Sequence, residues 1–201
     1  MKINGPGESP LLLLNVIKLL NRLKIPYAVI GAFAASFYGV VRASLDVDAV
    51  ISVKTHDEKM ERLFTFLGKK NLKVSVRQGD AEDPVRGVVN IEDQFKNRVD
   101  LLTGIRGMPN DIYGRAVTSS FMGSSLCIVS IEDFIAMKIF AGSPKDILDV
   151  VGVLKISAKR IDLALLRQLT RLYGKKELER LEKLLKEQFS LLLLRTSRDK
   201  N

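Results

Sequence analysis

The sequence has almost none of the residues that build disulfides or cysteine- and histidine-based metal sites. Cys127 is the only cysteine among its 201 residues, and His56 is the only histidine. A single cysteine excludes an internal disulfide and a zinc site built on cysteines, and a single histidine excludes a histidine-rich metal site. This composition fits a reducing compartment, so we expect a cytoplasmic protein.

Long hydrophobic runs are also missing. The longest apolar run, Leu11 to Leu20, is interrupted by Asn15 and Lys18. It is too short to cross a bilayer, and the residues before it lack the pattern of a signal peptide. We expect no membrane segment.

Charge is unevenly distributed along an otherwise ordinary globular composition of 46% hydrophobic and 27% charged residues. Residues 1–154 carry 19 Lys and Arg against 17 Asp and Glu, whereas residues 155–201 carry 13 against 6. The basic C-terminal part could attract RNA or another acidic partner through its lysines and arginines. The alternative is a solvated helical face with surplus lysine.

The order of patterns predicts strands early and helices late, which is an α/β or α+β fold with a helical C-terminal part. Ser9 and Pro10 have the residue types of an N-cap and a first helical position. Thr55 to Glu58 matches a capping box. The expected elements between these signals are a strand at 27–30, a helix at 32–39 and a strand at 44–53.

Two aspartates lie two positions apart in the strand expected at 44–53. Residues with this spacing project from the same face, so Asp46 and Asp48 should lie together while Leu45, Val47 and Ala49 take the opposite, buried face. Two neighbouring anions repel each other unless a cation neutralises them. Magnesium is the natural candidate, because it binds through one or two carboxylates together with substrate phosphates.

Gly31 ends the apolar run before this strand and opens a helix. A glycine turn that leads into a helix is a place where a phosphate binds, although Gly31 could also be a simple turn glycine. Together with the two aspartates, it predicts a metal-dependent enzyme that acts on a nucleoside triphosphate.

These motifs resemble the nucleotidyltransferase superfamily, in particular the small prokaryotic branch that includes the AbiEii-like proteins of toxin–antitoxin systems. The resemblance covers roughly residues 10–155. It is carried by Val29-Ile30-Gly31-Ala32, Gly39, Arg42, Ser44, Asp46-Val47-Asp48, Arg98-Val99-Asp100-Leu101-Leu102 and the block from Ser130 through Lys138 to Asp149.

The resemblance implies a mixed sheet flanked by helices, with a catalytic domain at 1–155 and a basic helical region at 156–201. It implies two-metal chemistry that transfers a nucleoside monophosphate from a triphosphate to a hydroxyl of an RNA, a protein or a small molecule, with release of pyrophosphate. Asp46, Asp48 and Asp100 would be the catalytic residues and would bind two Mg²⁺ ions, with Mn²⁺ as a substitute. The implied nucleotide-binding residues are Gly31, Ala32, Arg42, Ser44, Lys138 and Asp149.

Alternatives stay open at several of these positions. Arg42 could pair with a carboxylate, Lys138 could reach the surface, and Asp146 could be a helix N-terminal charge. Ala32 replaces the usual glycine or serine, which leaves open a degenerate copy that serves as an interaction partner such as an antitoxin. RNA binding without chemistry ranks last, because it leaves the aspartates unexplained.

Overall fold

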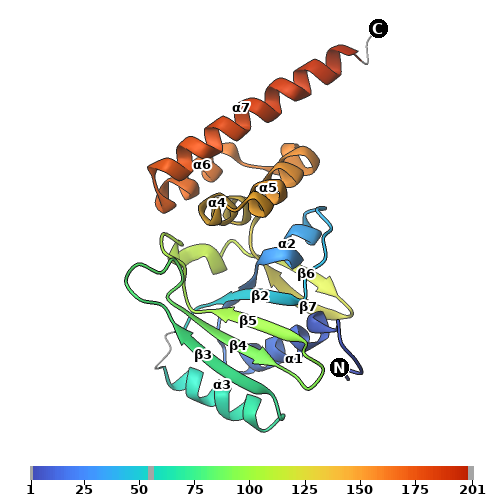
Figure 1. Ribbon diagram of the computed structural model, residues 1–201, viewed down its shortest axis with the longest axis vertical. Helices are drawn as coiled ribbons and strands as arrows, with labels where there is room; N and C mark the ends of the chain where they lie inside the picture. The colour runs from blue at the N-terminus through green and yellow to red at the C-terminus, as the bar shows by residue number, and fades with distance from the viewer. Residues whose placement is uncertain (1, 54–56, 199–201) are drawn as a thin grey trace. The chain divides into compact units, whose positions relative to one another are not determined.

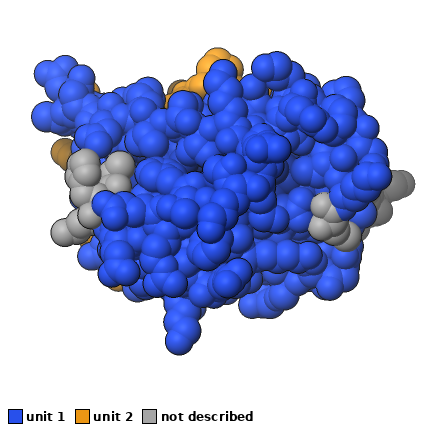
Figure 2. Space-filling view, turned by 90° about the horizontal axis from the view of Figure 1, so that it is seen from below, with its two compact units in different colours: residues 1–34, 42–106, 110–130 blue, residues 35–41, 107–109, 131–201 orange. Residues whose placement is uncertain are grey.

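The computed structural model describes residues 2–53 and 57–198, with side chains placed up to residue 188. The chain divides into two compact units, which Figure 2 marks in blue and orange. Unit 1 comprises residues 1–34, 42–106 and 110–130, and unit 2 comprises residues 35–41, 107–109 and 131–201. Each unit is described by itself.

Unit 1 is built on a mixed sheet of seven strands within the described residues, in the order β3-β4-β5-β2-β1-β7-β6 (Figure 1). The pairs β2/β5 and β1/β7 are parallel and the others are antiparallel. The strands are β1 (Tyr27–Val29), β2 (Asp46–Ile51), β3 (Lys73–Gln78), β4 (Gly87–Glu92), β5 (Arg98–Leu102), β6 (Val117–Phe121) and β7 (Ser124–Ile128). The unit also contains α1 (Ser9–Arg22), α3 (Glu58–Gly68), the short η1 (Asn110–Tyr113) and the first turn of α2 (Gly31–Phe37).

One face of the sheet is covered by α1 against β2 and β5 and by α3 against β3 (Figure 1). Val47, Ala49, Val99 and Leu101 are buried, and their alternation along β2 and β5 places them on one face. Burial of these apolar side chains under α1 is the main stabilising contribution of this layer. The polar residues between them, including the aspartates, therefore occupy the opposite face.

Unit 2 is helical. Within the described residues it contains the end of α2 followed by α4 (Ile131–Ala141), α5 (Pro144–Ser157), the short η2 (Ala158–Arg160), α6 (Leu163–Tyr173) and α7 (Lys175–Arg198). α4 packs against α5, α6 and α7. Its residues Phe134, Ile135 and Ile139 are almost fully buried, which is why this helix is apolar nearly all round.

The mixed α/β sheet with a helical C-terminal part is the fold class that the sequence predicts, and it is confirmed. The expected domain boundary at 155/156 falls inside α5, whereas the compact units separate at 130/131. The division into domains therefore stays a prediction. Among the described residues, no helix is both long enough and apolar enough to span a membrane.

Two local expectations are wrong, and a third concerns residues outside the described ranges. Leu45 precedes β2 and is 87% exposed, so its expected burial was wrong. Ser9 is not an N-cap: Glu8 occupies that position, and the Ser9 hydroxyl donates to the Leu45 carbonyl instead. The expected capping box begins on residues outside the described ranges, and Asp57 is the observed N-cap of α3.

Candidate active site

The three predicted catalytic aspartates lie on two neighbouring parallel strands. Asp48 on β2 is the ladder partner of Asp100 on β5, and Asp46 is the partner of Arg98. Because residues that are partners in a parallel ladder project from the same face, the register brings Asp46, Asp48 and Asp100 together on the face opposite α1. The local sequence predicts the first two on one face, and the register adds the third.

Arg98 is a residue of this cluster to which the sequence reasoning assigned no role. Its Nε donates to Asp100 Oδ1 at 2.8 Å and its Nη2 donates to Asp100 Oδ2 at 2.5 Å, so both carboxylate oxygens accept from one guanidinium. The hydrogen bonds to Asp100, with the charges of Asp100, Asp46 and Asp48, raise the pKa of Arg98 although desolvation opposes them. The guanidinium of Arg98 therefore interacts with all three carboxylates. Its position two residues before Asp100 is the signal that could have found it.

Asn90 on β4 completes the surroundings of Asp100. Its Nδ2 donates to Asp100 Oδ1 at 2.8 Å, and the side chain of Asp100 is 10% exposed. Among the described residues, no group of three or more His, Cys, Asp and Glu side chains is arranged to hold a metal ion. Joint metal binding by the three aspartates therefore stays a prediction.

The carboxylate of Asp48 lies directly over the backbone of Gly31. A Cβ atom built on Gly31 would approach Asp48 Oδ2 to a distance shorter than any real contact, and Gly31 has a φ of +65°. Only glycine meets both conditions without strain. The backbone N–H of Ile30 donates to the Asp48 carbonyl at 2.9 Å, which fixes the turn against β2. The Gly31 turn and β2 therefore hold each other in position through Asp48.

The other predicted nucleotide-binding residues of unit 1 lie around this turn. The Ser44 hydroxyl donates to Asp46 Oδ1 at 2.8 Å, so this serine orients the aspartate. Ala32 is buried in the first turn of α2, and Arg42 is half-buried in the segment before β2. Their contacts with a nucleotide stay predictions.

Lys138 belongs to a buried ion cluster in unit 2. Its Nζ lies 2.6 Å from Asp146 Oδ1 and 3.0 Å from Asp149 Oδ2, and the side chains of Lys138 and Asp149 are 11% and 2% exposed. Burial alone would raise the pKa of Asp146, but hydrogen bonds from Lys138 and Ser143 outweigh it and lower the pKa. This cluster joins α4 to α5, and the expected contacts of Lys138 and Asp149 with a nucleotide stay predictions.

The basic C-terminal helices are partly structural. Arg180 donates to the Ile139 carbonyl at the end of α4 at 2.7 Å, and Arg167 pairs with Glu182. Lys175, Lys176 and Lys183 are exposed on α7, as the sequence predicts. Arg180 is exposed as well, although its guanidinium makes the contact with the Ile139 carbonyl. Leu172 of α6 is 52% exposed, whereas the amphipathic pattern of that helix predicts that it packs.

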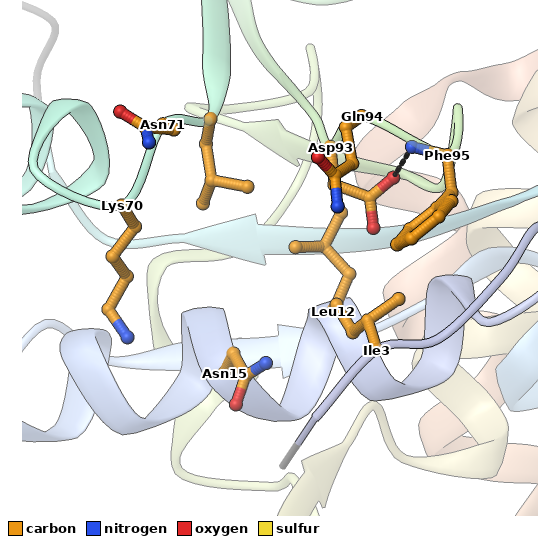
Figure 3. A pocket seen from close by; sticks show the side chains of 9 residues that line it. Ile3, Leu12, Asn15, Lys70, Asn71, Asp93, Gln94 and Phe95 are labelled. Atoms are coloured by element: carbon orange, nitrogen blue, oxygen red, sulfur yellow. Dashed lines mark hydrogen bonds between the residues drawn. The ribbon is translucent and has the colours of Figure 1, made fainter.

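A hollow lies on the α1 side of unit 1, away from the three aspartates. It has a volume of about 420 Å³ and is formed by α1, the turn after α3 and the β4–β5 turn (Figure 3). Leu12 and Phe95 supply apolar surface, whereas Asn15 and Lys70 supply polar groups. The Asp93 carboxylate accepts from the Phe95 N–H at 2.8 Å and so belongs to the turn itself. The three predicted catalytic aspartates lie on the other face of the sheet.

The sequence profile of a family described as nucleotidyl transferase of unknown function (DUF2204) matches residues 11–187. The chain belongs to this nucleotidyl transferase family. The match does not extend to the AbiEii-like branch, which stays a prediction. No curated protein matches the sequence.

Two solved structures share the fold. The first is ANT(2″)-Ia in complex with adenylyl-2″-tobramycin, with 14% identity, a TM-score of 0.54 and coverage of 83% of this chain and 96% of that chain. The second is TM1012 of Thermotoga maritima, a proposed nucleotidyltransferase, with 16% identity, a TM-score of 0.54 and coverage of 76% and 96%. At this identity the likeness concerns the fold alone.

Proposed function

We propose that this chain transfers a nucleoside monophosphate from a nucleoside triphosphate to a hydroxyl acceptor and releases pyrophosphate. The observation that carries the proposal is the register of Asp48 opposite Asp100, with Asp46 on the same strand face. A protein fold gains no stability from three neighbouring carboxylates, because their charges repel. Within a nucleotidyl transferase family, such a cluster is best explained by chemistry on a triphosphate.

The donor set fits a hard divalent cation such as Mg²⁺. Asp46 and Asp48 supply only oxygen ligands, and Ser44 orients the first while the Gly31 turn positions the second. Asp46, Asp48 and Asp100 would hold the cation or cations, with triphosphate oxygens as further ligands. When bound, the cation would neutralise the carboxylates and the triphosphate and polarise the α-phosphate.

The remaining roles belong to the chain's own groups. The acceptor oxygen attacks the α-phosphorus, the bond from this phosphorus to the β-bridging oxygen breaks, and pyrophosphate leaves. Asp100 takes the hydroxyl proton, because it is the carboxylate on the β4–β5 side of the cluster. The absence of a side chain on Gly31 leaves room for the Asp48 carboxylate at the start of α2, so a cation held by Asp48 would bring the phosphates to this turn. Arg98 balances the carboxylate charge and keeps Asp100 in place between turnovers.

A catalytically inactive family member that serves as a partner, such as an antitoxin, is the second candidate. One observation favours it: Arg98 engages both oxygens of Asp100, so the charge of this carboxylate is already balanced inside the protein. Ala32 in place of glycine or serine points the same way. A partner protein requires neither triphosphate binding nor release of pyrophosphate.

The test is incubation of the purified protein with each α-³²P-labelled triphosphate, Mg²⁺ or Mn²⁺ and a cell extract. We expect a labelled product and stoichiometric pyrophosphate with the wild type and neither with Asp48→Asn. If the folded wild type gave neither a labelled product nor pyrophosphate, the result would favour the catalytically inactive family member. Asp111→Asn is the matched control, because Asp111 is an exposed aspartate of η1 that pairs with Arg115.

A further inference from the structure

A hollow on the aspartate face lies next to Asp100. It has a volume of about 190 Å³ and lies over β3, β4 and β5. In the ladder Lys73 pairs with Glu92, Ser75 with Asn90, and Glu92 with Arg98, so these side chains project from one face. Its lining consists of Lys73, Ser75, Asn90, Glu92 and Arg98.

Two of the lining residues touch the proposed catalytic carboxylate. Asn90 and Arg98 both donate hydrogen bonds to Asp100. Asn90 is also the ladder partner of Asp100 across β4 and β5. A molecule in this hollow would therefore contact side chains that are themselves hydrogen-bonded to Asp100, the group that takes the acceptor proton. If the proposed function holds, this is where the acceptor binds.

The outer end of the hollow carries the charges of Lys73 and Glu92, whereas Arg98 at its inner end is paired with Asp100. The one carboxylate of the hollow, Glu92, accepts a hydrogen bond from Lys96 at 2.9 Å. The hydrogen bond from Lys96, followed by the charges of Lys96, Lys73 and Arg98, lowers the pKa of Glu92 although desolvation opposes them. Because Glu92 is paired with Lys96, it does not by itself neutralise Lys73, and Lys73 carries the charge that an anionic ligand would meet at the outer end of the hollow. Lys73 is exposed at the edge strand, where its ammonium group can meet an anion.

We propose that the acceptor is a small hydroxyl compound that carries a phosphate group. This inference rests on the proposed nucleotidyl transfer. The phosphate would bind Lys73 at the outer end of the hollow, and the hydroxyl would point to Asp100 at the inner end. Sites for drug-sized ligands measure roughly 300–1,000 Å³. At about 190 Å³ the hollow accepts one sugar-sized end of an acceptor. A polycationic acceptor such as an aminoglycoside would meet the like charge of Lys73 at the outer end.

The test measures binding calorimetrically with the nucleotide site filled by α,β-methylene-ATP and Mg²⁺. The probes are ribose 5-phosphate, ribose and the aminoglycoside kanamycin. We expect ribose 5-phosphate to bind about tenfold more tightly than ribose, as one charge-assisted contact provides, and more tightly than kanamycin. Lys73→Ala should remove this preference, and Lys73→Glu should reverse it in favour of kanamycin.

Lys70→Ala and Lys70→Glu are the matched controls, because Lys70 is an exposed lysine of the same unit that lines the hollow on the α1 side. Both should keep the wild-type preference. If the ATP analogue binds but the wild type prefers ribose or kanamycin, or binds no probe, the acceptor inference is wrong and nucleotidyl transfer stands. The acceptor inference is also wrong if Lys73→Glu still binds ribose 5-phosphate more tightly than kanamycin, as the wild type is expected to do. If the ATP analogue does not bind, the proposed function itself fails.

Discussion

Arg98 donates two hydrogen bonds to the Asp100 carboxylate, one of 2.8 Å from Nε to Oδ1 and one of 2.5 Å from Nη2 to Oδ2. The two residues are neighbours on the same face of β5, and the pair lies beside Asp46 and Asp48 on β2. An internal cation therefore compensates the carboxylate cluster in the absence of a divalent ion. A bound cation would relieve Arg98 of this role.

Replacement of Arg98 by methionine should make the protein more dependent on divalent cations. In chelator, the free energy of unfolding should fall by about 1–3 kcal/mol, because Asp100 loses a charged hydrogen-bond partner. Added Mg²⁺ should then stabilise the variant more than the wild type, since a ligand of the folded state stabilises it more the more tightly it binds. Urea titrations with EDTA and with Mg²⁺ measure both effects.

Arg77→Met is the matched control for this experiment. Arg77 pairs with Asp83 at 2.5 Å near the edge of the same sheet and has no part in the aspartate cluster. Its loss should cost less stability than the loss of Arg98, as for an exposed pair, and leave the response to Mg²⁺ unchanged. Equal Mg²⁺ responses of Arg98→Met and Arg77→Met would contradict the role given to Arg98.

Gly31→Ala should damage the aspartate cluster as well as the backbone. A left-handed φ costs a residue with a Cβ about 1–2 kcal/mol, and the new methyl group would also displace the Asp48 carboxylate. Gly123→Ala isolates the first cost, because Gly123 has a φ of +73° with nothing within 4 Å of a Cβ. We expect Gly31→Ala to be the more destabilised and to lose the metal-dependent response to ATP, which Gly123→Ala should keep. Thermal unfolding with and without ATP and Mg²⁺ compares them.

Lys138→Met should destabilise the helical unit strongly. The change leaves Asp149, whose side chain is 2% exposed, without its cation, and loss of one partner of a buried ion pair costs about 3–5 kcal/mol. Asp149→Asn in the same chain should recover part of this loss, because the amide carries no charge. Denaturant titrations of the two single variants and the double variant give the coupling. Lys145→Met, an exposed lysine of α5, should be neutral, and additive effects of Lys138 and Asp149 would refute the coupling.

Acid should destabilise the protein partly through Asp146. Its folded-state pKa lies below the ordinary 3.8, despite the opposing effect of burial, because Lys138 and Ser143 donate to it. A depressed folded pKa contributes stability that is present above the unfolded pKa and is lost as the pH falls through the folded pKa. The free energy of unfolding should therefore fall below about pH 4.

Ser143→Ala tests this dependence. The variant loses the hydroxyl that donates to Asp146 Oδ2 at 2.6 Å, so the pKa of Asp146 should move back towards its ordinary value. At pH 7 the loss of the cap should cost about 1 kcal/mol. The difference between variant and wild type should shrink as the pH falls from 5 to 3. A difference that grows in acid would show that Asp146 does not carry this dependence.

The sequence predicts the parts of the site that depend on local spacing. Strand alternation is a property of neighbouring residues, so it predicts Asp46 and Asp48 on one face and Val47 and Ala49 on the other. The prediction fails for Leu45, because β2 begins at Asp46 and the alternation of side chains applies only within a strand. The resemblance supplied Asp100 as a third carboxylate.

The remaining features depend on pairing across long stretches of chain. Asn90 meets Asp100 only through the β4–β5 register, and Lys73 meets Glu92 only through the β3–β4 register. Local patterns do not fix either register. Arg180 shows the same limit on helices, because the amphipathic pattern predicts its exposed position on α7 but not the Ile139 carbonyl to which its guanidinium donates.

The central claim is that the aspartate face binds a triphosphate together with a divalent cation. The most direct measurement is the thermal shift produced by ATP, by Mg²⁺ and by both, in the wild type, Asp48→Asn and the control Asp111→Asn. We predict a shift for ATP with Mg²⁺ that clearly exceeds the sum of the separate shifts in the wild type and in Asp111→Asn. Asp48→Asn should keep its fold and lose this excess. A full excess in Asp48→Asn, or no excess in the wild type, would contradict the account.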